Sequence, residues 1–315
     1  MHHLVIGEGQ IGRAIIERAL ADGDTVTVLR RSAKEPTPEL RRVAGDVLDP
    51  AALGAAIEGA DAVMATFHSP YDARLWREQL PPREAAVLDA AAEHEIPVVF
   101  PESLYGFQGG AASLAEDASP SPQDEKGRIR VELLRARRAH RARTLSVIAS
   151  DLIGPTTVGT GSAVATAMVL EPILSGRRAI LFGRADVPHT LTFVPDLAAA
   201  MLHAARHAER LSGPSGDAVL NAPAAPARTQ RELIAEVSRL AGRPARRPLP
   251  IPRAALALLT PVSAFVRELR GISGLWYGPC VQEPGRLVRE EGLAATSWED
   301  AVAVTVEAAR ARQDS

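Results

Sequence analysis

The sequence predicts an α/β protein in which a doubly wound, mostly parallel sheet is followed by a smaller and mostly helical part. Short apolar runs at residues 4–6 and 25–29 are rich in Val, Ile, Leu and Thr, which is typical of buried strands. Segments with the apolar spacing of helices lie between such runs, and this alternation indicates a parallel sheet covered on both faces. A glycine-rich turn joins the first strand to the first helix.

The other elements follow the same alternation up to Asp151. We expect strands at residues 43–46, 60–66, 96–100 and 145–149, and helices over residues 50–57, 82–94 and 125–141. Beyond Asp151 we expect isolated strands at residues 179–182 and 218–221, helices over residues 194–207, 253–270 and 298–312, and a loop at residues 159–161. Thr229 and Glu232 have the spacing of a capping box. The change of pattern predicts a core over residues 1–155 and a substrate-side region over residues 156–315.

Composition restricts the classes of function. The chain is 46% hydrophobic and 23% charged with a net charge of -2, so nothing indicates nucleic acid or an anionic membrane as a partner. No apolar run approaches the length that spans a bilayer, and the N-terminus lacks the features of a signal peptide. The single cysteine, Cys280, excludes an intramolecular disulfide and is consistent with the cytoplasm. With one cysteine and no HExxH motif, we expect no metal site.

The turn at residues 7–12 has the pattern GxGxxG in the context that dinucleotide binding requires, between a strand and a helix. Gly7 permits the tight turn, Gly9 lets the backbone approach a pyrophosphate, and Gly12 lets the helix pack closely on the strand. The helix that starts at Gln10 and Ile11 then points free N–H groups at the phosphates. The sequence therefore predicts a Rossmann-like NAD(P)-binding core.

Residues just beyond the second strand predict the coenzyme. Arg30 and Arg31 stand where a carboxylate would bind the ribose 2′-hydroxyl of NAD, and arginine there pairs with the 2′-phosphate of NADP. We therefore expect NADP(H) to be preferred over NAD(H), although two solvated arginines in a loop are the alternative. Asp46 and Val47 would lie near the adenine, or Asp46 could cap the helix that begins near Pro50.

Given this turn, the chain resembles the extended short-chain dehydrogenase/reductase family, of the NAD-dependent epimerase/dehydratase type. Four further segments carry the resemblance, in the family's order. Residues 45–49 (GDVLD) are similar to its GDxxD segment, and residues 101–106 (PESLYG) to the segment in which a serine precedes Tyr-Gly. Residues 151–155 (DLIGP) resemble a segment that ends in Gly-Pro, and residues 189–196 a motif that ends in Val-x-Asp.

The family's catalytic pair is Tyr-x-x-x-Lys, and this sequence keeps only its second member. Lys126 matches the lysine that binds the nicotinamide ribose, but Pro122 stands where the tyrosine would transfer a proton. Another group could replace the tyrosine, with Tyr105 nearest and Ser103 orienting a carbonyl oxygen. Further candidates are Tyr71, Asp124 and His189. Alternatively the enzyme works without the tyrosine, or the protein is a non-catalytic NADP(H) sensor like the NmrA-like relatives of this superfamily.

Other features leave alternatives open. His68 follows the strand at residues 60–66 and could touch a ligand or be a plain loop residue. The basic run at residues 128–143 is typical of a solvated helix face. The aromatic segment at residues 274–277 could be a pocket wall, a core plug or a contact in a homodimer. Residues 283–286 stand where the family often has an Asp-Ser pair, which indicates divergence on the substrate side.

Together these observations predict an NAD(P)-dependent oxidoreductase or epimerase/dehydratase-like enzyme acting on a small oxygenated metabolite. We expect Ser103, Tyr105 and Lys126 in the catalytic part of the site. The coenzyme-binding residues expected are Gly7, Gly9, Gln10, Ile11, Gly12, Arg30, Arg31, Asp46, Val47 and Lys126.

Overall fold

The computed structural model describes residues 1–32, 37, 40–158, 163–259 and 264–313. The described chain forms two compact units, and the chain passes between them more than once. Unit 1 comprises Met1–Ser103, Ile129–Ile148 and Leu197–Leu220, and unit 2 comprises Leu104–Arg128, Ala149–Asp196 and Asn221–Ser315. The loop expected at residues 159–161 lies outside the described residues.

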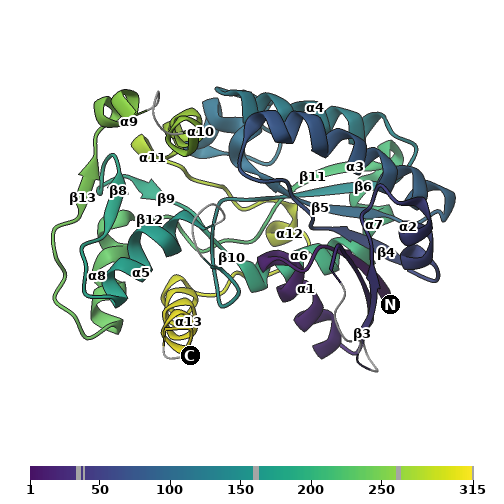
Figure 1. Ribbon diagram of the computed structural model, residues 1–315, viewed down its shortest axis with the longest axis horizontal. Helices are drawn as coiled ribbons and strands as arrows, with labels where there is room; N and C mark the ends of the chain where they lie inside the picture. The colour runs from purple at the N-terminus through teal and green to yellow at the C-terminus, as the bar shows by residue number, and fades with distance from the viewer. Residues whose placement is uncertain (33–36, 38–39, 159–162, 260–263, 314–315) are drawn as a thin grey trace. The chain divides into compact units, whose positions relative to one another are not determined.

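Unit 1 is built on a seven-stranded sheet in the order β11-β6-β5-β4-β1-β2-β3 (Figure 1). The strands are β1 (His2–Ile6), β2 (Thr25–Arg30), β3 (Leu40–Ala44), β4 (Ala62–Ala65), β5 (Val98–Ser103), β6 (Thr144–Ala149) and β11 (Asp217–Asn221). Neighbouring strands from β3 to β5 pair in parallel. The strand order changes direction at β1, and ligands of such sheets bind beyond the carboxyl ends of the strands on either side of that change. The predicted doubly wound fold is confirmed.

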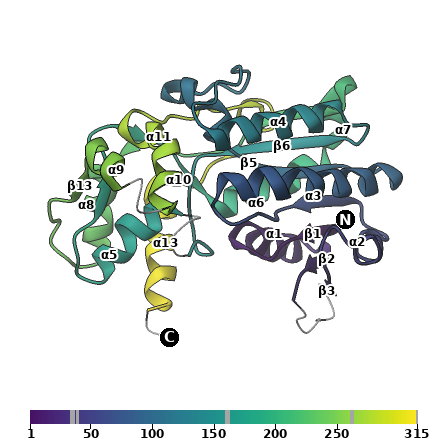
Figure 2. The ribbon, with the colours of Figure 1, turned by 45° about the horizontal axis from the view of Figure 1, so that its top comes forward.

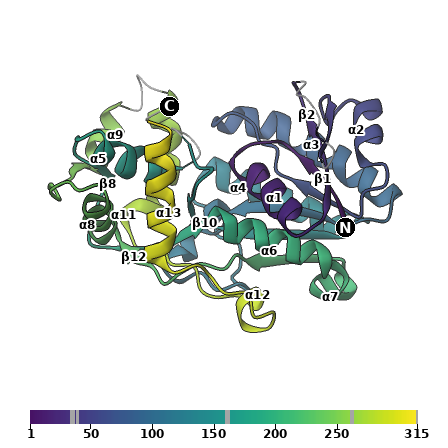
Figure 3. The same ribbon diagram turned by 90° about the horizontal axis from the view of Figure 1, so that it is seen from below.

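Helices cover both faces of this sheet. Helices α2 (Pro50–Ile57), α3 (Ala73–Glu93) and α4 (Glu125–Ala139) lie on one face, whereas α1 (Gln10–Ala21) and α6 (Val194–Arg206) lie on the other (Figures 2 and 3). Alternate strand residues face each layer, as the period of two requires. The core beneath α2 and α3 contains Leu4 and Ile6 of β1 but not Val5, together with the helix residues Leu53, Ile57, Val87 and Leu88.

Helix α3 begins earlier than the sequence pattern predicted. We expected its start at residue 82, yet it runs from Ala73, with Pro81 and Pro82 inside it. The side chain of Asp72 accepts hydrogen bonds from the N–H groups of Arg74 and Leu75 and so caps its first turn. Burial of Trp76 and Leu80 then holds the first turns in place despite the prolines, whose missing N–H groups interrupt the helical ladder.

Unit 2 combines short strand pairs with helices. Strand β7 (Asp151–Ile153) pairs in parallel with β10 (Leu191–Phe193), β8 (Ile180–Phe182) with β13 (Leu249–Ile251), and β9 (Pro188–His189) pairs antiparallel with β12 (Arg228–Thr229). The main helices are α8 (Gln230–Leu240) and α13 (Trp298–Ala311), whose apolar faces share one core. Thr229 and Glu232 form the predicted capping box at the start of α8.

The helix expected over residues 253–270 is described as two helices, α9 (Arg253–Leu259) and α10 (Ala264–Ile272), and residues 260–263 lie outside the described part. The other short elements of unit 2 are the 3-10 segment η1 (Leu104–Ser113), the π-helical turn η2 (Thr166–Leu170), α5 (Glu171–Leu174), α11 (Gly274–Tyr277) and α12 (Arg286–Arg289). Within the described residues, no helix is both long and apolar enough to span a bilayer.

Candidate functional site

The glycine turn at residues 7–12 packs against the residues that follow β4. Gly7 has a φ of +99°, which L side chains rarely adopt, and a Cβ there would lie 3.1 Å from the backbone nitrogen of Phe67. The Thr66 hydroxyl donates to the carbonyl oxygens of Ile6 (3.0 Å) and Gly7 (2.9 Å). The positive φ and the close approach of Phe67 therefore require glycine at residue 7. The hydrogen bonds of Thr66 hold the turn against the end of β4.

The other two glycines have different surroundings. A Cβ at Gly9 would meet no described atom within 4 Å, so the turn is open where a ligand's phosphates would approach. A Cβ at Gly12 would lie 2.0 Å from the Gly7 carbonyl oxygen, so α1 packs directly on the turn. Gly9 is the N-cap of α1 and has no side chain to occupy the first N–H groups. An open, uncapped helix N-terminus fits a pyrophosphate, because its N–H groups and its dipole attract anions.

Arg30 ends β2 beside the turn, as expected, but it has a partner that sequence reasoning missed. Its Nη1 donates to Glu8 Oε2 at 2.6 Å, and its Nη2 donates to the Ser32 hydroxyl at 2.9 Å. Arg42 Nη2 lies 3.5 Å from Glu8 Oε1. Glu8 occupies a variable position of the GxGxxG pattern, which carries no signal for this contact. Arg31 is exposed.

Asp46 does not cap α2. The cap is Asp49, whose carboxylate accepts hydrogen bonds from the N–H groups of Ala51 and Ala52. Asp46 instead accepts from Leu48 N at 3.1 Å, and its other oxygen lies 3.8 Å from Arg83. The Val47 side chain is buried in the core beneath α2. That alternative for Asp46 was therefore wrong, because Asp49 is the residue that directly precedes the helix.

A buried network of ion pairs joins α3, α4 and β5, and the sequence patterns did not predict it. Arg137 donates to both oxygens of Glu84 (2.7 Å each), to Glu102 (2.9 Å) and to the Ser146 hydroxyl (3.0 Å). The Arg137 side chain is 1% exposed and that of Glu102 is fully buried. The basic run at residues 128–143 is therefore a solvated face only in part, because the buried Arg130 and Arg137 lie against carboxylates of α3 and β5.

Ser103 is adjacent to this network. Its hydroxyl and its backbone N–H both donate to Glu102 Oε1, at 3.4 and 2.8 Å. Arg130 Nε lies 3.5 Å from the same oxygen. The Ser103 hydroxyl is thus oriented by a carboxylate whose charge is itself balanced by arginines.

The contacts of His68 indicate a structural role. Its Nδ1 donates to the Ser69 carbonyl at 2.7 Å, and its Nε2 accepts from Arg130 at 2.6 Å. The ring packs edge-on against Trp76 with centroids 4.6 Å apart. Although part of the residue reaches the surface, desolvation of the ring and then the charge of Arg130 lower the pKa of His68 to about 4. The ring is therefore neutral at neutral pH and both its nitrogens are engaged.

Lys126 lies near the start of α4, in the part of that helix that belongs to unit 2, and has an acidic partner in the same unit. Its ammonium is 2% exposed and donates to the carboxylate of Glu268 and, at 3.0 Å, to the Glu268 carbonyl. Asp124 Oδ2 is 4.0 Å from the same nitrogen. Glu268 belongs to α10, more than a hundred residues along the chain, so spacing gives no signal for this pair.

Asp124 itself caps α4. Its Oδ1 accepts from Gly127 N at 2.8 Å and from Gln108 Nε2 at 3.2 Å, and burial raises the pKa of this carboxyl. A Cβ on Gly271 would lie 2.5 Å from Asp124 Oδ2, so α10 approaches the carboxylate through a glycine. Tyr105 belongs to η1, and its carbonyl would lie 2.3 Å from a Cβ on Gly127.

His189 and Asp151 are further titratable groups of unit 2 whose pKa values are shifted. His189 stacks on Trp276 with centroids 4.3 Å apart, and desolvation lowers the pKa of His189 to about 4. Asp151, at the start of β7, accepts from Ala165 N at 3.0 Å. Although the residue as a whole is half-buried, desolvation of its carboxyl raises the pKa of Asp151 to about 7. The backbone N–H groups that donate to the carboxylate oppose this rise, and no cation is among the causes of the shift.

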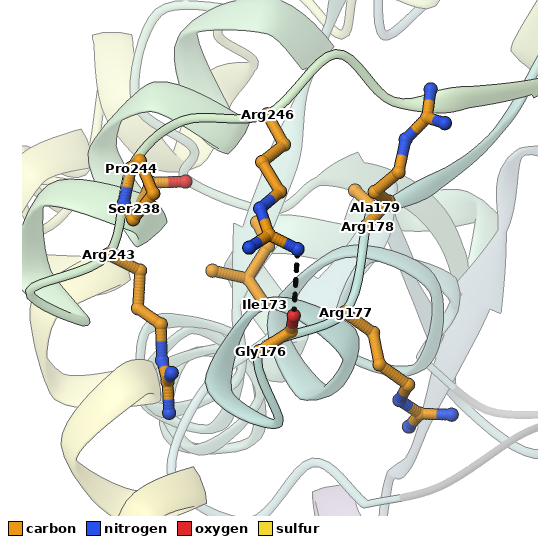
Figure 4. A pocket seen from close by; sticks show the side chains of 9 residues that line it. All are labelled: Ile173, Gly176, Arg177, Arg178, Ala179, Ser238, Arg243, Pro244 and Arg246. Atoms are coloured by element: carbon orange, nitrogen blue, oxygen red, sulfur yellow. Dashed lines mark hydrogen bonds between the residues drawn. The ribbon is translucent and has the colours of Figure 1, made fainter.

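A pocket lies in unit 2 between the end of α5 and the segment that follows α8 (Figure 4). Of the described residues that line it, none is acidic and four are arginines: Arg177, Arg178, Arg243 and Arg246. Three of these donate to backbone carbonyls: Arg243 to Leu174, Arg246 to Gly176, and Arg178 to Arg247 and Pro248. These contacts tie residues 243–248 to the segment at the end of α5, which gives three of the four arginines a structural role.

The sequence also contains an HxxxH spacing, His203 and His207, whose rings pack with centroids 4.4 Å apart. In the part of the chain that is described, no group of three or more His, Cys, Asp or Glu residues is arranged to hold a metal ion.

Comparisons with known proteins agree with this geometry. Residues 7–146 match the model of a family described as NAD(P)H-binding. UDP-glucuronic acid 4-epimerase from Bacillus cereus, solved with NAD, superposes with a TM-score of 0.77 at 12% identity over 99% of each chain. UDP-glucose 4-epimerase from Thermotoga maritima, solved with UDP-glucose, gives 0.75 at 14% identity over 99% of this chain and 100% of its own.

UDP-glucose 4-epimerase from Thermus thermophilus, solved with NAD, gives a TM-score of 0.71 at 18% identity over 98% of this chain and 99% of its own. The chain therefore has the same fold as these three solved epimerases. The resemblance seen in the sequence is confirmed for the fold and for the NAD(P)H-binding domain. No curated protein matches the chain by sequence.

Proposed function

We propose that this protein is an NADP(H)-dependent oxidoreductase or epimerase/dehydratase-like enzyme that acts on a small oxygenated metabolite. The observation that carries the proposal is the glycine turn, open at Gly9 and continuous with the uncapped N-terminus of α1, with Arg30 beside it. Nucleotide sugars are the first substrate class to test, because the epimerases of like fold were solved with UDP-glucose or are named for such substrates.

Each group of coenzyme-binding residues has one proposed role. Gly7 and Gly12 shape the turn and the start of α1, and Gly9 with the N–H groups of Gln10 and Ile11 holds the pyrophosphate. Arg30 and Arg31 bind the 2′-phosphate, which is why NADP(H) is preferred over NAD(H), and residues 46–47 border the adenine. A bound nicotinamide supplies a hydride donor or acceptor.

On the substrate side, Lys126 binds the nicotinamide ribose, Ser103 orients the substrate oxygen and Tyr105 exchanges a proton with it. Ser103 is supported by its fixed contact with Glu102. The role of Lys126 requires a change of partner, since the Glu268 carboxylate accepts a hydrogen bond from its ammonium in the structure. The cytoplasm is the proposed location and a homodimer the proposed assembly.

A second function, a non-catalytic NADP(H) sensor, is favoured by one specific observation. Pro122 cannot transfer a proton, and the Lys126 ammonium is held by Glu268. A protein with this arrangement can bind the coenzyme without using it, and exchange of the Lys126–Glu268 contact would then couple binding to a change in α10.

One experiment tests the coenzyme and then the chemistry. NADPH and NADH binding are measured by fluorescence for the wild type and Arg30→Asp. We expect the substitution to reverse the preference, because it removes a cation and adds an anion beside the 2′-phosphate. An unchanged preference would show that the NADP(H) assignment is wrong.

Carbonyl compounds and UDP-sugars are then screened for turnover, with Lys126→Ala as the comparison. Turnover that is lost in Lys126→Ala supports the enzyme. Tight NADPH binding without turnover of any compound supports the sensor.

A further inference from the structure

Glu8, Arg30 and Arg42 form a compact cluster beside the glycine turn. The Glu8 carboxylate lies between the two guanidinium groups, 2.6 Å from Arg30 Nη1 and 3.5 Å from Arg42 Nη2. The side chains of Glu8 and Arg42 are each 9% exposed and that of Arg30 is 28% exposed. The carboxylate is thus largely withdrawn from water and held by two cations.

The sheet register explains why the two arginines meet. Strands β2 and β3 pair in parallel with Val28 opposite Arg42, so these two side chains point to the same face. Arg30 is two residues beyond Val28 and therefore shares that face. Leu29 points the other way, into the core beneath α2, which leaves the arginines on the face that α1 covers. Glu8 reaches them from the turn that precedes α1.

A carboxylate between two guanidinium groups makes the contacts that a phosphate would make there. One oxygen accepts a charge-assisted hydrogen bond from Arg30 and the other forms an ion pair with Arg42, and a phosphate is likewise recognised by several guanidinium groups at once. Resting on the proposed coenzyme, we propose that Glu8 is an internal competitor of the 2′-phosphate, and that Arg42 is a second phosphate-binding arginine. Glu8 must leave the cluster before the phosphate can enter, because two anions cannot share the site without repulsion.

This arrangement makes Glu8 a determinant of coenzyme specificity. While Glu8 contacts Arg30 and Arg42, the two arginines are ordered and neutralised, and NADP(H) binding is weakened by the cost of displacing the carboxylate. NAD(H) has no 2′-phosphate and does not need the displacement. Removing the charge of Glu8 should therefore strengthen binding of the phosphorylated coenzyme selectively.

The test is calorimetric titration of the whole chain at one fixed salt concentration, with 2′-AMP, 5′-AMP, NADPH and NADH as probes. Glu8→Gln keeps the shape of the side chain and removes its charge. We expect it to tighten 2′-AMP and NADPH binding by about tenfold, the size of one charge-assisted interaction. Binding of 5′-AMP and NADH should change by less than about twofold, since the lost charge faces only the 2′ position.

Two further variants complete the design. Arg42→Gln should weaken 2′-AMP and NADPH binding by about tenfold, since it removes one of the two guanidinium groups. Glu132→Gln is the matched control, because Glu132 pairs with Arg77 in an exposed contact on α4. It should leave all four titrations unchanged.

Unchanged or weaker 2′-AMP binding in Glu8→Gln would overturn the proposal and show that Glu8 only orients Arg30. Loss of NADH binding in Glu8→Gln would overturn it too, because Glu8 would then be a ligand of the ribose 2′-hydroxyl. If 2′-AMP binding tightens while neither NADPH nor NADH binds any variant, the phosphate site stands and the proposed coenzyme function fails.

Discussion

Arg137 illustrates how much a single buried residue can hold together. Its guanidinium satisfies two carboxylates and a hydroxyl, and it lies 3.9 Å above the centre of the Phe100 ring. Both carboxylates are almost entirely removed from water, so neither has solvent to replace a lost partner. The contribution of Arg137 is therefore mainly that it compensates the buried charge of Glu84 and, together with Arg130, that of Glu102.

The first prediction follows from this network. Arg137→Met keeps the apolar volume but leaves Glu84 and Glu102 without their shared cation. The free energy of unfolding should fall by about 3–5 kcal/mol, as measured by chemical denaturation. Arg77→Met is the control, because Arg77 and Glu132 form an exposed pair that should contribute less than about 1 kcal/mol. Equal losses in the two variants would contradict the role assigned to Arg137.

Sequence patterns predicted single residues well only where the backbone itself carries the signal. Gly7 and Gly12 could be assigned because a positive φ and a close helix approach admit no side chain. The partners Glu8 and Glu268 could not, because an ion pair between distant segments has no fixed spacing. Arg30 was correctly placed at the end of β2, yet its contact with Glu8 emerges only from the folded turn.

At the scale of elements, the junction of β1, the glycine turn and α1 depends on the absence of one methyl group. A Cβ at Gly12 would overlap the Gly7 carbonyl oxygen, whereas a Cβ at Gly54, in the middle of α2, would meet no described atom within 4 Å. Neither glycine has a positive φ. Alanine substitutions at the two positions therefore distinguish the packing requirement at Gly12 from the general destabilisation that glycine causes in a helix.

The second prediction compares these glycines. Gly12→Ala should push α1 away from the turn, lower the thermal midpoint and weaken binding of NADPH and NADH alike. Gly54→Ala should raise the free energy of unfolding by about 0.5–1 kcal/mol, because alanine loses less backbone entropy in a helix. Differential scanning fluorimetry with and without coenzyme measures both. A Gly12→Ala variant as stable as Gly54→Ala would refute the close approach.

Helix boundaries could be predicted where capping residues and apolar periodicity agreed. The prediction was wrong where the local preference of proline opposed the packing of buried side chains. The capping box at Thr229 was found from its spacing alone. The start of α3 was missed because two prolines were taken as its beginning, whereas Asp72 and the buried residues Trp76 and Leu80 start the helix a full nine residues earlier. Propensity is a local quantity, and burial of an apolar face outweighed it here.

At the scale of the whole molecule, alternation of strands and helices was enough to predict the doubly wound sheet. The division of the chain was not predictable in the same way. The segments Ile129–Ile148 and Leu197–Leu220 belong to the unit that contains the N-terminus, so the units are not consecutive stretches of chain. Sequence patterns describe neighbours along the chain, and this division depends on contacts between distant segments.

The last prediction concerns the pH dependence of stability, to which buried groups of opposite sign contribute. Burial raises the pKa of Asp151 from 3.8 to about 7, so between these values the folded protein keeps a proton that the unfolded chain has released. Stability from this group is therefore lost as the pH rises from about 4 to 7 and is constant above. The pKa of His189 is lowered from 6.5 to about 4, so its effect is opposite: stability falls as the pH drops below 6.5.

Asp151→Asn separates the two effects, because it removes one titration and keeps an acceptor for the N–H of Ala165. The difference in unfolding free energy between variant and wild type should shift in favour of the variant as the pH rises from about 4 to 7, and then stay level. Denaturant titrations at several pH values measure this difference directly, and the contribution of His189 cancels in it. A difference that does not vary with pH would mean that Asp151 titrates alike in the folded and unfolded chain.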